Sequence, residues 1–398
     1  MGDILLTISL LTGGTRPELT KCIRSLDHLR AALPCELIIT DTGCDKAHRE
    51  LIESEADRVL DFTWVNDFAA ARNVSLEAAR GQWYLYLDDD EWFEGTAEIE
   101  HFFKSGEYKD AQRAGYRQRN YFDMSGDKYE DTYVGRMTAM LPGIHFHGKI
   151  HEFLDTPAYT DGGECPLLND FVHHYGYVQG LDGTGQNRQA RNIPLLIEMI
   201  SEEPDCDRWY YQLLLDYAVL RDMEGVEKVS RMALETIPYK EMYPKFYHSF
   251  VIAILDGYLR RIKDENNVNL GNDLMAAFSF LMTILARTDT FGDGSGFYEG
   301  KVSMYGALFS MAADDRENTI GFCRRYYRAT LKTGLVEERV KKAAEQENYI
   351  SIKTLLSEEA VQKQFSEMAV YFGSRYTDDA FSPPVAKMVA DAEEWAND

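Results

Sequence analysis

The sequence predicts an α/β domain with a mixed sheet, followed by an all-α domain of helical repeats. Short apolar runs rich in β-forming residues alternate with helical periodicity between Ile4 and Leu87, the pattern of consecutive βα units. Polar–apolar alternation follows at 116–122 and 132–140 and indicates antiparallel strands. From about Asn187 the apolar residues keep helical spacing. We therefore expect a domain at 1–180, a linker helix at 181–205 and a helical domain at 206–398.

The expected strands of the first domain end at polar residues. Apolar runs occupy 4–11, 36–40 and 83–87, with a shorter one near 59–62. Helical spacing fills the segments between them, and Asp67 is the expected N-cap of the helix before the third long run. In such sheets ligands bind outside the carboxyl ends of the strands. The residues that directly follow each run are therefore the first candidates for a site.

Composition excludes several functional classes. The formal net charge is -24, with 66 acidic against 42 basic residues, so nucleic acid and anionic membranes are repelled. A bound nucleotide would need a divalent cation or a few well-placed bases. No apolar run approaches the roughly 20 residues that cross a bilayer, and the N-terminal run indicates a strand instead of a signal peptide. Six scattered cysteines without CxxC spacing favour free thiols in a reducing cytosol.

The strongest motif is the run of acids Asp88, Asp89, Asp90 and Glu91 directly after the third long apolar run. Four consecutive carboxylates repel one another, and burying them is costly unless they are paired. A hard divalent cation resolves the conflict, since Mg²⁺ and Mn²⁺ take oxygen ligands and bridge carboxylates to phosphates. An isolated acidic run is more often a solvated turn or a helix N-cap. The position at a strand end favours the metal site.

Two further residues lie where a nucleotide is expected. Asp41 ends the second strand and can accept hydrogen bonds from a base or a ribose; alternatively, its side chain folds onto its own turn. Arg72 lies about one turn into the helix that begins after Asp67 and can reach a phosphate or the acidic run. The alternative for Arg72 is a structural ion pair.

Histidines and one glutamate complete the candidate set. Five of the nine histidines lie in two short runs, at 145–151 and 173–174. Strand alternation places His173 and His174 on opposite faces, so one of them can join a metal; the alternative is a histidine satisfied within the core. Glu152 is a candidate general base, with a helix-capping acid as the alternative.

Other enzyme classes lack their signatures here. The sequence contains no GxxxxGK[ST], GxGxxG, GxSxG or HExxH motif, and the loop at 12–15 is too short for a phosphate loop without a following lysine. A nucleotidyltransferase would show Arg and Lys in a Gly-rich loop after the first strand, where only Arg16 is present. A non-catalytic helical-repeat binding protein remains the second rival, although it does not require a complete acidic run.

Taken in order, the residues at 41–43, 66–73, 87–91, 148–152 and 174–177 resemble the motifs of bacterial family 2 glycosyltransferases with a GT-A fold. The sequence is most similar to a subgroup with a tetratricopeptide-like (TPR-like) tail, whose linker helix resembles 191–196. The resemblance extends to about residue 240. Beyond it the likeness is only helical, with a partial match to a repeat of about 34 residues.

The resemblance implies a metal-dependent, inverting transfer of a hexosyl or N-acetylhexosaminyl group from a nucleotide-sugar, expected to be a UDP-sugar. Mn²⁺ or Mg²⁺ is the implied cofactor. By the same resemblance, the residues implied to bind the nucleotide-sugar are Ser9, Leu10, Asp41, Arg72, Asp88 and Asp89. The implied metal ligands are Asp88, Asp90 and His174, and the implied catalytic residues are Asp90 and Glu152.

Two departures from the family pattern affect this assignment. The segment 13–16 replaces an Asn-Glu pair that is common in the first loop, and Asp89 stands where a small residue is usual. The acceptor is expected to be a protein or peptide, because TPR-like surfaces hold peptides; a glycan or lipid-linked acceptor is the alternative. The helical domain is the expected surface for any homo-oligomer.

Overall fold

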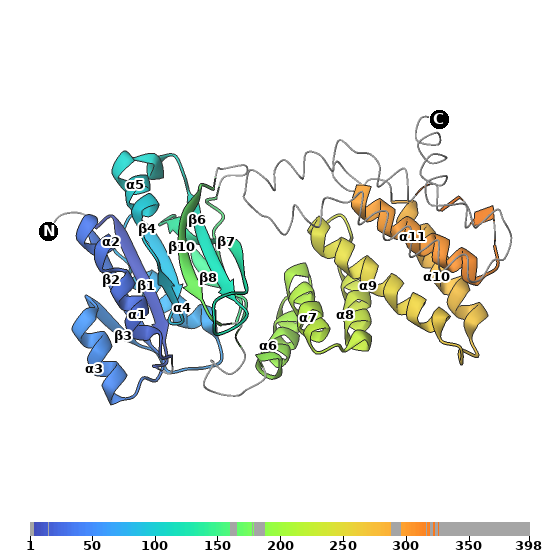
Figure 1. Ribbon diagram of the computed structural model, residues 1–398, viewed down its shortest axis with the longest axis horizontal. Helices are drawn as coiled ribbons and strands as arrows, with labels where there is room; N and C mark the ends of the chain where they lie inside the picture. The colour runs from blue at the N-terminus through green and yellow to red at the C-terminus, as the bar shows by residue number, and fades with distance from the viewer. Residues whose placement is uncertain are drawn as a thin grey trace. The chain divides into compact units, whose positions relative to one another are not determined.

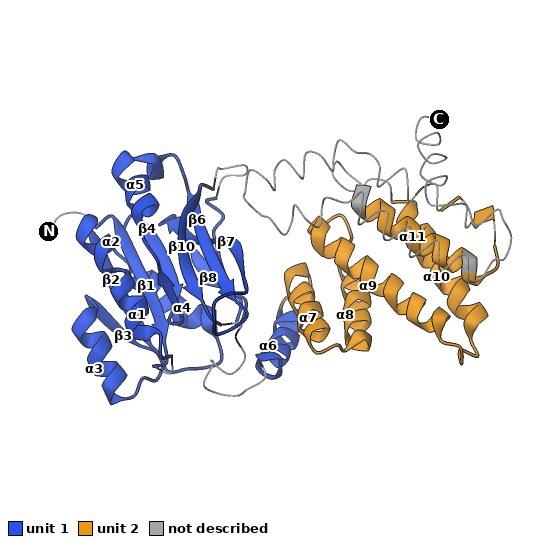
Figure 2. Cartoon of the chain, viewed as in Figure 1, with its two compact units in different colours: residues 1–202 blue, residues 203–398 orange. Residues whose placement is uncertain are grey.

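The computed structural model describes residues 4–14, 16–159, 165–176, 178, 188–287, 296–315, 317–318, 321–322 and 325. The chain divides into two compact units, 1–202 and 203–398 (Figure 2). Helix α6 (Arg188–Glu202) therefore belongs to the first unit. The expected boundaries at 180 and 205 stay predictions. The sequence also predicts a helix at 319–333 and a glycine-rich loop at 292–296, and most of both ranges lies outside the described residues.

Within the described residues, the first unit contains an eight-stranded mixed sheet with the order β3-β2-β1-β4-β7-β6-β10-β5 (Figure 1). A separate ribbon pairs β8 with β9. The strands are β1 (Leu6–Thr12), β2 (Cys35–Asp41), β3 (Arg58–Asp61), β4 (Trp83–Asp88), β5 (Glu91–Phe93), β6 (Arg113–Tyr121), β7 (Tyr129–Ala139), β8 (His145–His147), β9 (Phe153–Asp155) and β10 (Leu167–His174).

Strand direction changes in the middle of the sheet. Strands β3, β2, β1 and β4 are parallel, whereas β7 runs antiparallel to both β4 and β6. Thr12 lies opposite Asp41, and Leu11 lies opposite Asp88. The carboxyl ends of three neighbouring strands thus meet at one edge. The predicted mixed sheet is confirmed, and β6 and β7 are the antiparallel strands expected near 116–122 and 132–140.

Helices cover both faces of this sheet. They are α1 (Leu19–Ser25), α2 (Asp27–Ala32), α3 (Lys46–Glu55), α4 (Phe68–Ala78) and α5 (Ala97–Ser105). Asp67 caps α4 as predicted, because its carboxylate accepts a hydrogen bond of 2.8 Å from the amide of Ala70. The helical spacing at 16–33 corresponds to two short helices that meet at Leu26, whose φ of -88° and ψ of -11° tighten the turn between them.

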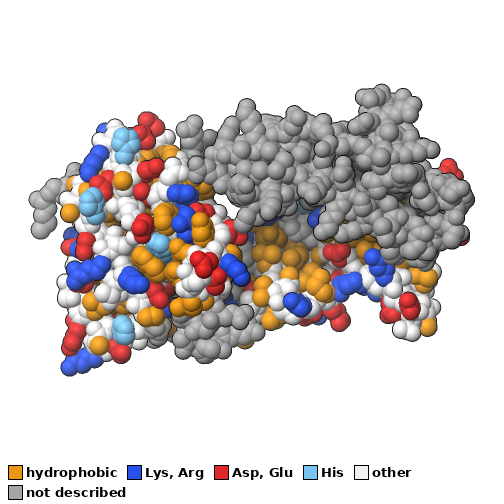
Figure 3. Space-filling model, in the orientation of Figure 1, with side chains coloured by type: hydrophobic (Ala, Val, Ile, Leu, Met, Phe, Trp, Pro, Cys, Tyr) orange, Lys and Arg blue, Asp and Glu red, His pale blue; other side chains and the backbone are white. Residues whose placement is uncertain are grey.

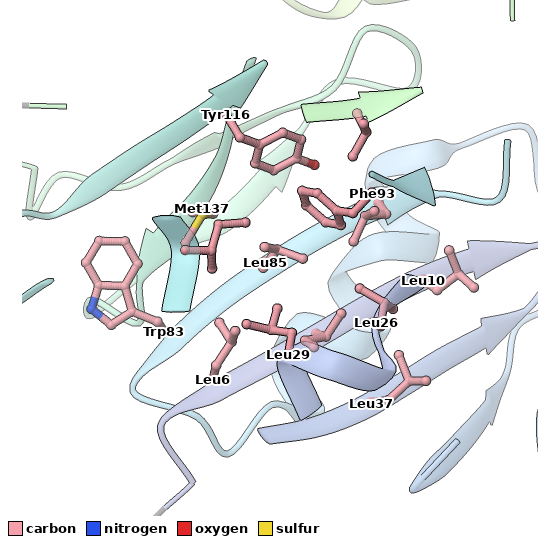
Figure 4. Packing of buried hydrophobic residues seen from close by; sticks show 14 of the residues in the cluster. Leu6, Leu10, Leu26, Leu29, Leu37, Trp83, Leu85, Phe93, Tyr116 and Met137 are labelled. Carbon is pink, nitrogen blue, oxygen red and sulfur yellow. The ribbon is translucent and has the colours of Figure 1, made fainter. Parts of the chain in front are cut away.

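The core follows from the alternation of side chains along the strands. Leu85 and Leu87 of β4 face one layer, where Leu26 and Leu29 pack against the sheet beside Leu10 (Figure 4). Complete burial of a leucine contributes about 1.5–3 kcal/mol. On the opposite face of β4, two tyrosines pack against α4 and β8. Strands β1, β2 and β4 are therefore covered on both sides, which leaves their ends to contact a ligand.

The second unit is helical in its described part, as predicted. It comprises α7 (Asp207–Val219), α8 (Met223–Thr236), α9 (Pro244–Lys263), α10 (Leu270–Leu285) and α11 (Gly296–Ala312). Consecutive helices pack together from α7 to α11. Glu227 of α8 accepts hydrogen bonds from Arg231 and from Arg261 of α9. Gly257 permits this approach, since a Cβ there would lie 1.9 Å from Glu227 Oε2. None of the helices in the described residues is long and apolar enough to cross a bilayer.

We expect Glu36→Gln to destabilise the first unit. Glu36 is 2% exposed and accepts hydrogen bonds from Thr7 Oγ1 at 2.7 Å and from Arg80 Nη2 at 2.6 Å. Burial opposes ionisation, but the bonds from Arg80 and Thr7 outweigh it and lower the pKa of Glu36. Because hydrogen bonds to charged groups contribute about 1.5–3 kcal/mol, the variant should lose roughly that much free energy of unfolding at pH 7, measured by chemical denaturation.

The sign of the pH dependence provides the check. A lowered carboxyl pKa contributes stability above its unfolded value of about 4.3, and this contribution is lost as the pH falls through the folded value. The difference between wild type and Glu36→Gln should therefore shrink between pH 5 and pH 3. Glu50→Gln is the control, because Glu50 forms an exposed pair with Lys46, and such pairs contribute little. A difference that is constant with pH would contradict the assignment.

Candidate functional site

The four acids between β4 and β5 lie at the edge where the carboxyl ends of the parallel strands meet. Asp88 is the last residue of β4 and Glu91 is the first of β5. Although they are consecutive in sequence, the four side chains have four different sets of partners. Two are held by buried arginines, one joins the first strand, and one faces a histidine.

Asp88 is neutralised by two arginines from separate elements. Arg136 of β7 donates from Nη2 to Asp88 Oδ2 at 2.8 Å, and Arg72 of α4 donates to Oδ1. Burial would raise the pKa of Asp88, but the charges of Arg136 and Arg72 outweigh burial and hold that pKa well below its usual range. Asp88 is therefore an ionised carboxylate with both oxygens bonded to guanidinium groups.

Glu91 closes the turn from the other side. It is fully buried and accepts a hydrogen bond of 2.8 Å from Arg136 Nη1 and another from Gln118 of β6. Its carboxylate also accepts the backbone N–H of Asp88 at 3.2 Å. Burial raises the pKa of Glu91, and Arg136 only partly offsets it. Arg136 thus holds the first and last acids of the run at the same time.

Asp89 connects the acidic run to β1. Its Oδ2 accepts a hydrogen bond of 2.6 Å from Thr12 Oγ1, and Thr12 is the last residue of β1. Burial raises the pKa of Asp89 to about 7, with the charge of Asp90 adding to the effect and the Thr12 bond opposing it. Asp89, which departs from the family pattern, therefore links the turn after β4 to the end of β1 by a hydrogen bond.

Asp90 is the member of the run that faces a histidine. His174 Nε2 lies 3.9 Å from Asp90 Oδ1, and Arg16 Nη2 lies 3.4 Å from Asp90 Oδ2. His174 Nδ1 lies 2.6 Å from the amide oxygen of Asn120, which can only accept, so Nδ1 carries the proton. Gly176 leaves room for this pair, because a Cβ there would lie 2.3 Å from His174 Nε2.

The two adjacent histidines of β10 face opposite ways, as predicted. His173 Nδ1 lies 2.7 Å from the hydroxyl of Tyr121, and its Nε2 lies 2.9 Å from Glu94. The structure thus brings His174, and not His173, to the acidic run. Among the described residues, no three carboxylate, imidazole or thiol groups are gathered as a cation site. Asp90 and His174 are the two predicted ligands that lie near each other.

Glu152 and Asp88 are bridged by Arg72. Arg72 Nε donates to Glu152 Oε1 at 2.6 Å, while the Tyr86 ring lies 5.0 Å from the guanidinium carbon. The remaining nitrogen, Nη1, is buried and has no hydrogen-bond acceptor within the described part of the chain. Arg72 thus forms the structural ion pairs that were its alternative interpretation, and these pairs hold the candidate base beside the acidic run.

Asp41 reaches the same edge but is engaged by its own turn. Its Oδ1 accepts the backbone N–H groups of Gly43 and Cys44 at 2.8 and 2.7 Å, and its Oδ2 accepts from Arg49 at 3.0 Å. Burial opposes ionisation, but the amides of Cys44 and Gly43 outweigh it and lower the pKa of Asp41. Only one strand, β1, separates Asp41 from Asp88. Contact with a base or ribose stays a prediction.

Ser9 and Leu10, expected to bind the nucleotide-sugar, have side chains inside the packed layers. Ser9 Oγ lies 2.8 Å from Ser75 Oγ of α4, and Leu10 is fully buried in the core. Strand alternation sends these side chains into the two layers that the helices cover. Only their backbone could contact a ligand, and Thr12, two residues later, is the β1 side chain that reaches the acids.

Sequence reasoning missed Arg136, which has more contacts to the acidic run than any other base described above. Arg136 is separated in sequence by 48 residues from Asp88 and by 45 from Glu91, and no motif surrounds it. The sequence offered one signal for it, because an arginine between apolar neighbours on a predicted strand indicates a buried charge that needs an acidic partner. Elsewhere, acidic and basic side chains are interspersed over the visible face of the first unit (Figure 3).

Comparisons with known proteins identify the families that parts of the chain resemble. Residues 14–161 match the family model described as glycosyl transferase family 2. The SPbeta prophage-derived glycosyltransferase SunS of Bacillus subtilis is 24% identical over 238 residues, covering 57% of this chain and 52% of SunS. A TPR repeat-containing protein of Synechococcus elongatus is 41% identical over 188 residues, covering 43% of this chain and 42% of that protein. The chain thus spans about half the length of these curated relatives.

Among solved structures, the chain resembles S. aureus TarS 1–349 in complex with UDP-GlcNAc. The TM-score is 0.38 at 11% identity, with 80% of this chain and 90% of that chain covered.

We expect His174 to stay neutral below the usual pKa of histidine, about 6.5. Burial lowers the pKa of His174, and the charges of Asp90 and Asp88 only partly oppose it. The unfolded chain then binds more protons below pH 6.5, so this histidine reduces stability as the pH falls. NMR titration of the ring protons, assigned with a His174→Gln variant, should show a midpoint below 6.5. A midpoint at or above that value would refute the expectation.

Proposed function

Because residues 14–161 match the glycosyl transferase family 2 model, we propose that this chain transfers a sugar from a nucleotide-sugar, expected to be a UDP-sugar, with inversion at the anomeric carbon. The observation that carries the proposal is the Asp90–His174 pair at the strand ends, beside an Asp88 that two arginines already neutralise. The transferred group is expected to be a hexosyl or N-acetylhexosaminyl residue.

The donor atoms suit a divalent cation of the Mn²⁺ or Mg²⁺ type. Asp90 offers carboxylate oxygens, the ligands that these cations prefer, and His174 would add an imidazole nitrogen. The hydrogen bond from His174 Nδ1 to Asn120 fixes the tautomer whose Nε2 faces Asp90, as second-shell partners of metal ligands commonly do. Asp88, also predicted as a ligand, has both oxygens bonded to arginines, so we assign the metal to Asp90 and His174 with diphosphate oxygens.

Charge explains why the reaction needs that cation. The leaving nucleoside diphosphate is anionic, and two acids of the run, Asp89 and Asp90, have no buried arginine partner in the described structure. When bound, Mn²⁺ or Mg²⁺ would neutralise charge that develops on the leaving diphosphate. Arg16, which reaches within 3.4 Å of Asp90, is the base placed to contact the same phosphates.

Glu152 is the proposed general base. As the acceptor oxygen or other nucleophile attacks the anomeric carbon, Glu152 takes its proton and the bond from that carbon to the diphosphate breaks. Arg72 orients the carboxylate through its bond of 2.6 Å. Arg72 also binds Asp88, so it holds Glu152 at a fixed place beside the acidic run. A fixed base next to the donor site would hold the acceptor and the donor in a reactive orientation.

The acceptor is proposed to be a protein or peptide. The helical hairpins of the second unit and the similarity to a TPR repeat-containing protein support a polypeptide-binding surface. A labelled donor sugar added to the full chain and a bacterial lysate should give label that protease releases. Label in a lipid extract or in free glycan would instead favour the alternative acceptors.

The donor class is tested with a panel of UDP-, GDP- and dTDP-sugars, with and without Mn²⁺. We expect a UDP-sugar with Mn²⁺ to raise the thermal unfolding midpoint, since a ligand that binds only the folded state stabilises it. The same mixture should release UDP slowly by hydrolysis. A chain that neither binds nor hydrolyses any donor would favour the non-catalytic binding protein.

Asp90→Asn should reduce kcat/KM by at least about 100-fold, the scale at which electrostatic stabilisation of a leaving group operates. The loss should accompany a weaker dependence on Mn²⁺. Asp110→Asn is the matched control, because Asp110 is exposed in the loop before β6. Full activity of a folded Asp90→Asn protein would remove the metal role.

Glu152→Gln should reduce kcat by about 100- to 10,000-fold, the usual contribution of general base catalysis. The KM for the donor should change little, since the glutamine amide still fills the site beside Arg72. Steady-state transfer kinetics with the identified acceptor measure both constants. An active Glu152→Gln enzyme would show that another group accepts the proton.

A further inference from the structure

Within the described residues, Arg136 is the charged side chain that pairs with both ends of the acidic run. It extends from β7 next to Met137, which pairs with Leu85 of β4. Its two terminal nitrogens bind the first and last acids, Asp88 and Glu91, each at 2.8 Å. Such a fork is specific to arginine, because a lysine presents a single charged point.

The contacts of Arg136 leave few ways for the turn to open. The guanidinium carbon lies 5.2 Å from the centre of the Tyr86 ring, and Glu91 is further held by Gln118 and by the backbone N–H of Asp88. Only two residues, Asp89 and Asp90, lie between the clamped ends. The direction of their side chains therefore follows from the distance between Asp88 and Glu91.

Without Arg136, the distance between the Asp88 and Glu91 side chains would no longer be fixed. Asp88 would keep Arg72, but Glu91 would remain buried without a cationic partner, and like charges in the turn would repel each other. The turn would widen, and Asp90 would move relative to His174, which β10 holds through Asn120. The ion pairs of Arg136 go to Asp88 and Glu91.

We propose that Arg136 is a positioning residue that aims Asp90 at His174 by clamping Asp88 and Glu91 across the β4–β5 turn. This inference rests on the proposed function, because it assigns Arg136 a part in presenting the cation ligand. It differs from a purely structural role, which would affect the folded fraction but leave the cation dependence of the folded protein unchanged.

The test compares Arg136→Lys and Arg136→Met with Arg119→Met in the full chain. Arg119 lies on the neighbouring strand β6 and forms an ion pair with Asp131 at 2.8 Å, so the control removes an equally paired arginine away from the turn. Circular dichroism melts establish the folded fraction of each variant. Electron paramagnetic resonance then measures the affinity of each variant for Mn²⁺ without requiring turnover. This affinity depends on how Asp90 and His174 are placed.

Loss of a group that orients metal ligands typically costs 10- to 100-fold in affinity or activity. Arg136→Lys should therefore bind Mn²⁺ at least about 10-fold more weakly, with a matching rise in the Mn²⁺ needed for half-maximal UDP release. Arg119→Met should stay within about twofold of wild type. Arg136→Met should lose more Mn²⁺ affinity than Arg136→Lys. If the methionine variant does not fold, the affinity of Arg136→Lys tests the proposal.

The outcomes separate the two proposals. If the wild type turns over a donor and Arg136→Lys binds Mn²⁺ as tightly as the wild type, the positioning role alone would be overturned. A wild type that neither binds Mn²⁺ nor turns over any donor would overturn both the proposed function and the role of Arg136. Equal losses in Arg119→Met and Arg136→Lys would show a general effect of removing arginine ion pairs and would also refute the positioning role.

Discussion

The first unit depends on the neutralisation of buried carboxylates at the end of β4. Four acids in succession cannot be buried without compensating charge, and Arg72 and Arg136 supply it to Asp88 and Glu91. Once these two ends are paired inward, Asp89 and Asp90 are left to point elsewhere. The same ion pairs that permit the strand to end in acids therefore determine which acid faces the ligand side.

This arrangement connects stability with function. Arg72 lies on α4, whose start is set by the Asp67 cap, and it binds both Asp88 and Glu152. A proposed base and a proposed cation site thus share one buried guanidinium. Because these groups come from the β4–β5 turn, from β10 and from the segment around Glu152, their relative positions depend on the sheet that holds these segments.

The Asp90–His174 pair shows how neighbouring elements prepare a ligand site. Asn120 of β6 fixes the histidine tautomer, and Gly176 leaves room beside the ring. Burial lowers the pKa of His174 and so favours the neutral imidazole, the form that can donate electrons to a cation.

The sequence by itself determined strands β1 to β4, β6 and β7, the helical segments between β1 and β4, the cap at Asp67 and the position of the acids at a strand end, because periodicity and capping act over a few residues. It also placed His173 and His174 on opposite faces. Only the tertiary structure decided how each acid is used. Arg136 and Asp88 are 48 residues apart in sequence, and the pairing of β7 with β4 brings them together. Local sequence patterns do not predict such a contact, so the bond from Arg136 to Asp88 and the bond from Thr12 to Asp89 emerged only from the folded chain.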